Sequence, residues 1–130
     1  MASCCCVCKA VSLLDSCSML ASTSLPTPEL IDLMQTAVAA FSAGHVTQPV
    51  RTVLEVGQGH AFFASMPAFT GTIPALGAKL VTVFGENIAK GIPSHLATIL
   101  LLDPGTGALL AVMDGRFITE ARTAAVSAVA

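Results

Sequence analysis

Charged residues are scarce in this sequence of 130 residues, because only 11% of its positions are Asp, Glu, Lys or Arg. Roughly a quarter is typical of a soluble domain. The six Lys and Arg residues are spread singly and the net charge is -2, so the basic stripe of a nucleic-acid-binding protein is missing. Apolar residues make up 54% of the chain, which excludes a fully disordered polymer. We therefore expect one folded domain, with part of its surface against another subunit or another domain.

Long hydrophobic runs are missing as well. The longest, ATILLL and ALLAVM, have the length of strands. They are far shorter than the ~18–20 residues that span a bilayer. The N-terminus has Lys9 as its only base and lacks the basic segment of a secretory signal. We therefore expect no membrane span and a cytoplasmic location.

Cysteine does not occur after residue 17, and the five that precede this point are Cys4, Cys5, Cys6, Cys8 and Cys17. An odd number in one short stretch excludes a disulfide framework across the fold. Three consecutive cysteines surround a tetrahedral ion poorly and no histidine is near them, so we expect no metal site. A reduced tail and S-acylated thiols are the alternatives. We interpret residues 1–24 as a divergent, Cys- and Ser-rich, poorly ordered segment and residues 25–130 as the folded domain.

The spacing of apolar residues changes once along the folded part. A helix is expected from Thr27, with Pro28 in its first turn and Gly44 as its end. Its apolar positions recur at helical spacing. From residue 50 the period becomes two, which predicts about five mostly antiparallel strands. The segment DPGTG joins the last two in a hairpin, and a terminal helix is expected to begin near Thr119 as N-cap. The fold class is α+β, a mostly antiparallel sheet with flanking helices.

Few polar residues stand where they could carry chemistry. Arg51 opens one predicted strand, and Lys79 lies near the start of another, where its ammonium could reach solvent. Arg122 falls in the first turn of the terminal helix, where the macrodipole disfavours a cation but a bound anion would be stabilised. An anion site and a salt bridge to an acidic neighbour are equally good explanations of Arg122. Ser94 and His95 leave a glycine-containing loop, and His95 is a candidate ligand contact.

Several catalytic signatures are missing from the sequence. It contains no HExxH, no paired carboxylates, no Ser-His-Asp order and no GxGxxG loop. Residue patterns alone therefore indicate an α+β domain, leave both an anion site and a salt bridge open for Arg122, and indicate no specific reaction.

Five blocks of the sequence follow one another in the order of a known family: QPVRTVLEV, SMPAF, AKLVTVF, GIPSHLATILLLDPGTGALLAVMDG and ITEARTAAVSAVA. From about Leu25 to its end the chain resembles the ornithine cyclodeaminase/mu-crystallin family, in particular its ketimine reductase branch. The resemblance implies an N-terminal substrate-binding and dimerisation domain that is followed in the family by a Rossmann domain. That second domain would lie outside this chain.

The resemblance also implies a function and a site. Members use NADPH or NADH to reduce cyclic ketimine carboxylates, cyclise ornithine with loss of ammonia, or act on amino acids. Arg51, Lys79 and Arg122 match substrate-binding residues, and Lys79 would act in catalysis. Ser94, His95 and Arg122 match residues that touch the nicotinamide cofactor, and no metal is implied. The implied partners are a small cyclic imine or amino-acid carboxylate and a second subunit in a homodimer.

Two features set limits on what the resemblance implies. Leu96 stands where the family commonly has glutamine, which would change polar contacts near the cofactor. Without the Rossmann domain the main dinucleotide site is missing, so we expect this chain alone to be inactive. Besides the reductase, two alternatives stay open: a lyase of the ornithine cyclodeaminase type, and a non-catalytic module that dimerises or binds a small ligand such as a thyroid hormone.

Overall fold

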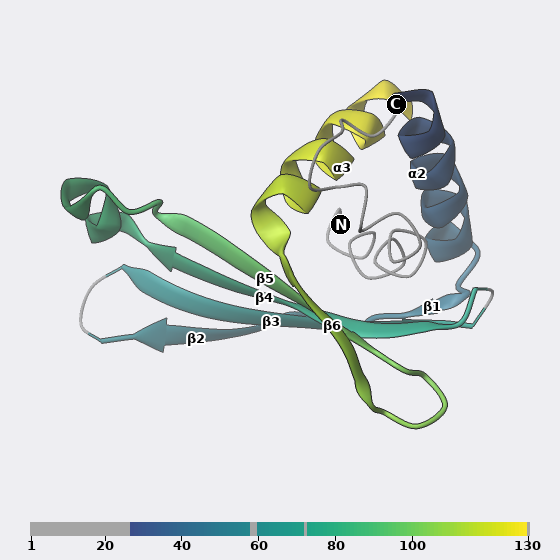
Figure 1. Ribbon diagram of the computed structural model, residues 1–130, viewed down its shortest axis with the longest axis horizontal. Helices are drawn as coiled ribbons and strands as arrows, with labels where there is room; N and C mark the ends of the chain where they lie inside the picture. Colours follow the sequence, from purple (N-terminus) through teal and green to yellow (C-terminus); the bar gives the residue numbers. More distant parts are fainter. Residues whose placement is uncertain (1–26, 58–59, 72, 130) are drawn as a thin grey trace.

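The computed structural model describes residues 27–57, 60–71 and 73–129. The segment 1–24, with its cysteine cluster, lies outside the described residues. The described chain forms two layers, a twisted antiparallel sheet and a pair of helices on one side of it (Figure 1). The predicted α+β class, with a mostly antiparallel sheet and flanking helices, is confirmed.

The sheet has six strands, one more than the sequence predicts. They are β1 (Val46–Thr47), β2 (Thr52–Val56), β3 (Ala61–Thr70), β4 (Ala75–Phe84), β5 (His95–Leu102) and β6 (Leu109–Asp114). The order is β1-β3-β4-β5-β6, with β2 also paired to β3, and every pair is antiparallel. The strand that the prediction missed is β1, which has only two residues and leaves almost no periodicity. The ten-residue strands β3 and β4 form the middle of the sheet.

The connection between β4 and β5 contains a second element that the sequence did not indicate, the 3-10 helix η1 (Gly85–Lys90). Gly91 ends it with a left-handed φ of 69°. The chain then returns to the sheet, where the N–H of Phe84 donates to the carbonyl of Ser94 at 2.8 Å. This bond holds the residue before β5 against the end of β4.

The β5–β6 hairpin forms at DPGTG, as predicted. One Asp103 oxygen accepts hydrogen bonds from the backbone N–H groups of Gly105 and Thr106 and from the Thr106 hydroxyl. The hydroxyl bond is the largest of the contributions that lower the pKa of Asp103 below its usual value. Gly107 closes the turn with φ 74°, a conformation that favours glycine.

The helix α2 (Thr27–Ser42) begins at the predicted residue. Gly44 follows its end with φ 77°, and its N–H donates to the carbonyl of Phe41 at 3.1 Å. Met34 is fully buried against Ala125 of α3 (Gly115–Val129). The two helices therefore stabilise each other through one short apolar stripe, and both lie over the same side of the sheet (Figure 1).

The prediction that Thr119 is the N-cap of the terminal helix is wrong. The helix begins four residues earlier, at Gly115, and Asp114 accepts a hydrogen bond from the N–H of Arg116 at 2.8 Å. A Cβ on Gly115 would lie 2.8 Å from the Cβ of Ala97, so only glycine lets the helix approach β5 this closely. Arg122 consequently lies beyond the first turn, and the expected unfavourable macrodipole does not apply to it.

The core lies between the sheet and α3. Ala97, Ile99 and Leu101 of β5 are buried on the face toward the helix, and Ile118 of α3 packs against the last two. The alternate residues of β5 point to the other face. Both helices lie on the core side, so among the described elements no helix covers that second face (Figure 1).

In the part of the chain that the structure describes, no helical segment has the length and apolar character of a membrane span. Within the same residues, no group of three or more His, Cys, Asp or Glu side chains is placed to hold a metal ion.

Candidate functional site

A hollow of about 530 Å³ opens on the core side of the sheet. We call it the basic hollow, since three cationic side chains contribute to its lining. The residues that line it are Arg51, Val53, Phe62, Ala64, Met66, Lys79, Val81, Val83, His95, Thr119 and Arg122. The structure thus brings together four of the residues predicted for the site, from a loop, two strands and a helix far apart in sequence.

Lys79 forms the floor of the basic hollow. It is the fifth of ten residues in β4, paired with Met66 on one side and Ile99 on the other. Its side chain is only 4% exposed. The expectation that it lies at a strand start with its ammonium in solvent is wrong, because β4 already begins at Ala75. Val81 and Val83 share its face and line the same hollow, as the alternation predicts.

Arg122 reaches the basic hollow from the helix layer. It is 8% exposed and lies one turn beyond Ile118 and one turn before Ala125, both of which are buried. This spacing of four and three residues places all three on the helix face toward the sheet. Arg122 therefore faces the sheet from the helix layer, on the opposite side of the basic hollow from Lys79.

Arg51 and His95 lie at the rim. Arg51 immediately precedes β2, and His95 is the first residue of β5, paired with Val83. Both are exposed, whereas Lys79 and Arg122 are buried. The basic hollow thus has two buried cations inside, a third cation at its edge and an imidazole beside it.

The charge of the basic hollow is of one sign. None of the described residues that line it is Asp or Glu. Apolar side chains, among them Phe62, Met66 and Val81, form much of its wall. Low-dielectric walls strengthen the field of the cations inside them. The arrangement suits a small ligand with one anionic and one apolar part.

A second hollow of about 490 Å³ adjoins the first, and we call it the side hollow. It is lined by Ile88, Pro93, Ser94, His95, Ala97, Arg116, Thr119 and Glu120. His95 and Thr119 line both hollows. The residues expected to touch substrate and those expected to touch cofactor therefore lie in neighbouring hollows that share a wall.

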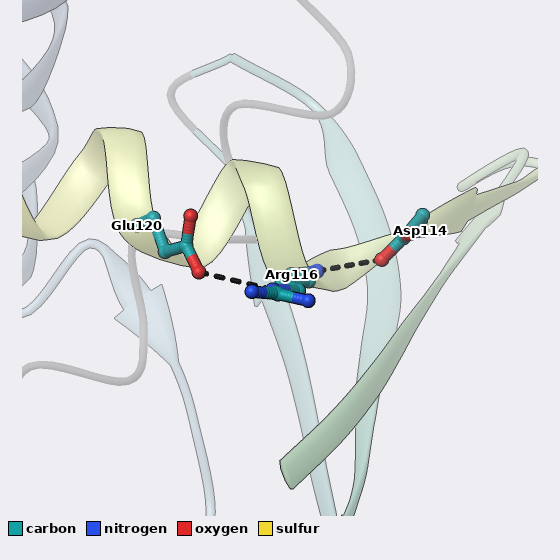
Figure 2. A network of polar contacts seen from close by, with 3 residues as sticks. All are labelled: Asp114, Arg116 and Glu120. Atoms are coloured by element: carbon teal, nitrogen blue, oxygen red, sulfur yellow. Dashed lines mark hydrogen bonds and ion pairs between the residues drawn. The ribbon is translucent and has the colours of Figure 1, made fainter. Parts of the chain in front are cut away.

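Arg116, Glu120 and Asp114 form a small polar network at the rim of the side hollow (Figure 2). The Nε of Arg116 lies 3.2 Å from the nearer oxygen of Glu120, and both side chains are well exposed. Asp114 accepts from the backbone N–H of Arg116. Glu120 and Asp114 are two of the acidic neighbours with which a salt bridge of Arg122 was expected, and both interact with Arg116.

Sequence reasoning missed two parts of the site. The apolar wall residues of β2 and β3 were not singled out, although their alternate positions along each strand were a usable signal. Thr119 was interpreted as a helix cap and instead lies between the hollows. Leu96, by contrast, points to the other face of the sheet from His95 and lines neither hollow. Its effect on contacts near the cofactor stays a prediction.

Known proteins that are similar to this chain include two reductases and a cyclodeaminase. Ketimine reductase mu-crystallin of Rattus norvegicus is 49% identical over 104 residues, which are 78% of this chain and 33% of that protein. The Δ1-pyrroline-2-carboxylate reductase of Thermococcus litoralis, solved in complex with NADH and L-proline, superposes with a TM-score of 0.73 at 42% identity. That match covers 79% of this chain and 32% of the solved one.

A lysine cyclodeaminase, solved for its recognition of L-lysine, L-ornithine and L-2,4-diaminobutyric acid, gives a TM-score of 0.68 at 33% identity. It is matched over 80% of this chain and 31% of its own. The chain therefore spans about a third of the length of each of these proteins. The family match covers residues 11–130 and starts earlier than the resemblance described from Leu25. This chain belongs to the ornithine cyclodeaminase/mu-crystallin family.

Proposed function

We propose that residues 25–130 are the substrate-binding and dimerisation domain of a cytoplasmic, NAD(P)H-dependent reductase of cyclic imine carboxylates. The observation that carries this proposal is the basic hollow, in which buried Lys79 and Arg122 meet Arg51 and His95 between apolar walls. A five- or six-membered ring with a carboxylate presents one anionic and one apolar part, which matches this lining.

Each cation has a role that follows from its chemistry. A guanidinium binds a carboxylate through two parallel N–H···O bonds, so Arg122 from the helix and Arg51 from the rim hold the substrate carboxylate. Lys79 on the floor donates a proton to the imine nitrogen as the C=N bond becomes C–N. Arg122 also lies near the side hollow, because it is one helical turn from Thr119, which lines both hollows. It could therefore contact the cofactor as well as the substrate.

The cofactor would complete the reaction from the side hollow. A reduced nicotinamide supplies the hydride for the imine carbon. The hydroxyl of Ser94, the imidazole of His95 and the nearby guanidinium of Arg122 are groups that hydrogen-bond a carboxamide, so the residues present fit the nicotinamide end of NADH or NADPH. The rest of the dinucleotide needs protein beyond these 130 residues.

The second face of the sheet supports the dimer. Its exposed apolar residues form what we call the open face: Leu54, Phe69, Leu96, Leu110 and Val112. Leu110 and Val112 of the edge strand β6 are 52% and 60% exposed. Several exposed apolar residues on a sheet face that no described helix covers are a candidate interaction site. In the proposed homodimer, a second copy of the chain packs against this open face.

A chimera tests the reductase function directly. This chain replaces the matching third of rat ketimine reductase mu-crystallin, and NAD(P)H oxidation is followed with Δ1-pyrroline-2-carboxylate. We expect turnover, and loss of turnover in the same chimera with Lys79→Met. A folded chimera that binds NAD(P)H but reduces no cyclic imine carboxylate would contradict the proposal.

The likeness to lysine cyclodeaminase favours one alternative, a lyase that releases ammonia from a diamino acid. The same chimera distinguishes the two reactions, because ammonia release from L-ornithine without net oxidation of NAD(P)H indicates the lyase. The open face favours a second alternative, a non-catalytic dimerising or ligand-binding module. A chimera that binds a small carboxylate and catalyses neither reaction would support that module.

A further inference from the structure

The hydroxyl of Thr119 is an exception within its own helix. Its Oγ1 is closed to solvent and forms no hydrogen bond. A buried hydroxyl without a hydrogen bond costs roughly 1–3 kcal/mol. Such a group in a folded protein requires an explanation, and one explanation is a ligand that supplies the partner.

Three other hydroxyls on the two helices form a hydrogen bond that Thr119 lacks, to the backbone carbonyl four residues earlier. Thr36 donates to the carbonyl of Asp32 at 3.0 Å, Thr123 to that of Thr119 at 2.6 Å, and Ser127 to that of Thr123 at 3.0 Å. Each bond reaches four residues back along the helix. The equivalent carbonyl for Thr119 belongs to Gly115, yet no such bond forms. Helix geometry alone therefore does not satisfy this hydroxyl.

The position of Thr119 points to a ligand. It lines the basic hollow together with Lys79 and Arg122, and the side hollow together with Ser94. It lies three residues before Arg122, so the two side chains share one side of α3. The close approach of Gly115 to Ala97 fixes this turn of the helix against β5. Thr119 is thus held where a substrate and a cofactor would meet.

We propose that Thr119 is a ligand-binding residue that donates a hydrogen bond to an sp² oxygen at the junction of the two hollows. A threonine in a helix has two accessible χ1 rotamers, so rotation about χ1 can turn Oγ1 from its closed position toward the ligand. The oxygen belongs either to the substrate carboxylate or to the nicotinamide carboxamide. This inference rests on the function proposed above, and it adds a residue that neither the charge pattern nor the motifs single out.

Three variants of the 130-residue chain test the inference. Thr119→Val keeps the branched shape and removes the hydroxyl, Thr119→Ser keeps the hydroxyl, and Thr119→Ala removes it in a second way should Thr119→Val not fold. Each is titrated with L-proline and, separately, with NADH by NMR chemical-shift perturbation. Thermal unfolding of each variant is measured in parallel.

We expect Thr119→Val to bind one of the two probes at least about fivefold more weakly, the loss of one hydrogen bond to a ligand oxygen. Its melting temperature should not fall, because an unsatisfied buried hydroxyl has been removed. Thr119→Ser should bind within about twofold of the unaltered chain, since its hydroxyl can form the same bond. Weakening with L-proline identifies the carboxylate as acceptor, and weakening with NADH identifies the carboxamide.

Two results overturn the inference alone: equal binding of both probes by Thr119→Val and the unaltered chain, or a loss in Thr119→Ser as large as in Thr119→Val. An unaltered chain that does not bind L-proline overturns the proposed substrate site, and the proposed function with it. The two failures are therefore distinguishable in one set of titrations.

Discussion

Both faces of the sheet carry apolar side chains, but they differ in what covers them. On the core side α3 packs on β5, and the buried cations Lys79 and Arg122 are enclosed by this packing. On the open face, residues such as Leu110 and Val112 are more than half exposed. One face therefore packs against helices of this chain, and the other presents exposed apolar side chains that no helix among the described elements covers. Stability should depend on the first face and association on the second.

The largest effect is expected from truncation in the core. Ile99→Ala removes a side chain that is fully buried between β5 and α3. We expect it to lower the free energy of unfolding by about 3 kcal/mol, from lost burial and the cavity left behind. Leu110→Ala on the open face is the control, expected to change it by less than about 0.5 kcal/mol in dilute solution. Urea unfolding measures both free energies. Equal losses would show that the two faces contribute equally to the stability of the monomer.

Gly115→Ala breaks the contact that positions the helix over the core face. The new Cβ would lie 2.8 Å from the Cβ and 3.0 Å from the carbonyl carbon of Ala97, so α3 has to shift. We expect a loss of about 1–3 kcal/mol. Gly85→Ala serves as the matched control, because its Cβ would meet nothing within 4 Å. An alanine at 115 that is tolerated as well as one at 85 would contradict the described helix position.

Val112→Asp tests whether the open face is the dimer interface. A carboxylate that is buried in an apolar interface carries a desolvation cost, so dimers that form through the open face should dissociate at least about tenfold more readily. The free energy of unfolding of the monomer should change little, since Val112 is already 60% exposed. Sedimentation equilibrium measures the dissociation constant. A dimer unaffected by this change would place the interface elsewhere.

The smallest effect is expected at the hairpin, away from both faces. The pKa of Asp103 is lowered in the folded chain, chiefly by the hydrogen bond from Thr106, so the ionised carboxylate stabilises the fold at pH values above its ordinary pKa. This contribution is lost as the pH falls through the lowered pKa. Asp103→Asn should therefore be slightly less stable than the unaltered chain at neutral pH and equal to it in acid. A difference independent of pH would exclude the charge as its cause.

Local chemistry made the hairpin and α2 predictable, while contacts across the fold decided the rest. The turn at Asp103 and the end of α2 at Gly44 depend on neighbours in sequence, and both were predicted. The start of α3 was not, because Asp114 and the approach of Gly115 to Ala97 outweigh the capping preference of Thr119. The burial of Lys79 was missed for the same reason. It depends on the pairing of β4 with β3 and β5, which alternation within one strand does not encode.

The sequence indicated which charged residues line the candidate site, but not how they are arranged in space. Resemblance to the family indicated Arg51, Lys79 and Arg122, and the structure brings them to one hollow with His95. Alternation along β2 and β3 was a usable signal for the apolar walls, whereas the place of Thr119 between the hollows follows only from the way in which the sheet and α3 pack. Physical reading of the sequence left Arg122 undecided between an anion site and a salt bridge.

Two arginines of α3 give the most direct test of the central claim, that the buried cations of the core face bind a carboxylate. Arg122 is 8% exposed in the basic hollow, whereas the side chain of Arg116 is 60% exposed and paired with Glu120. The affinity of the chain for L-proline is measured by NMR titration for the unaltered chain, Arg122→Met and Arg116→Met. We predict a loss of about tenfold or more for Arg122→Met, in line with a charge-assisted bond, and no change for Arg116→Met. Equal affinities in all three proteins, or equal losses in the two variants, would contradict the account.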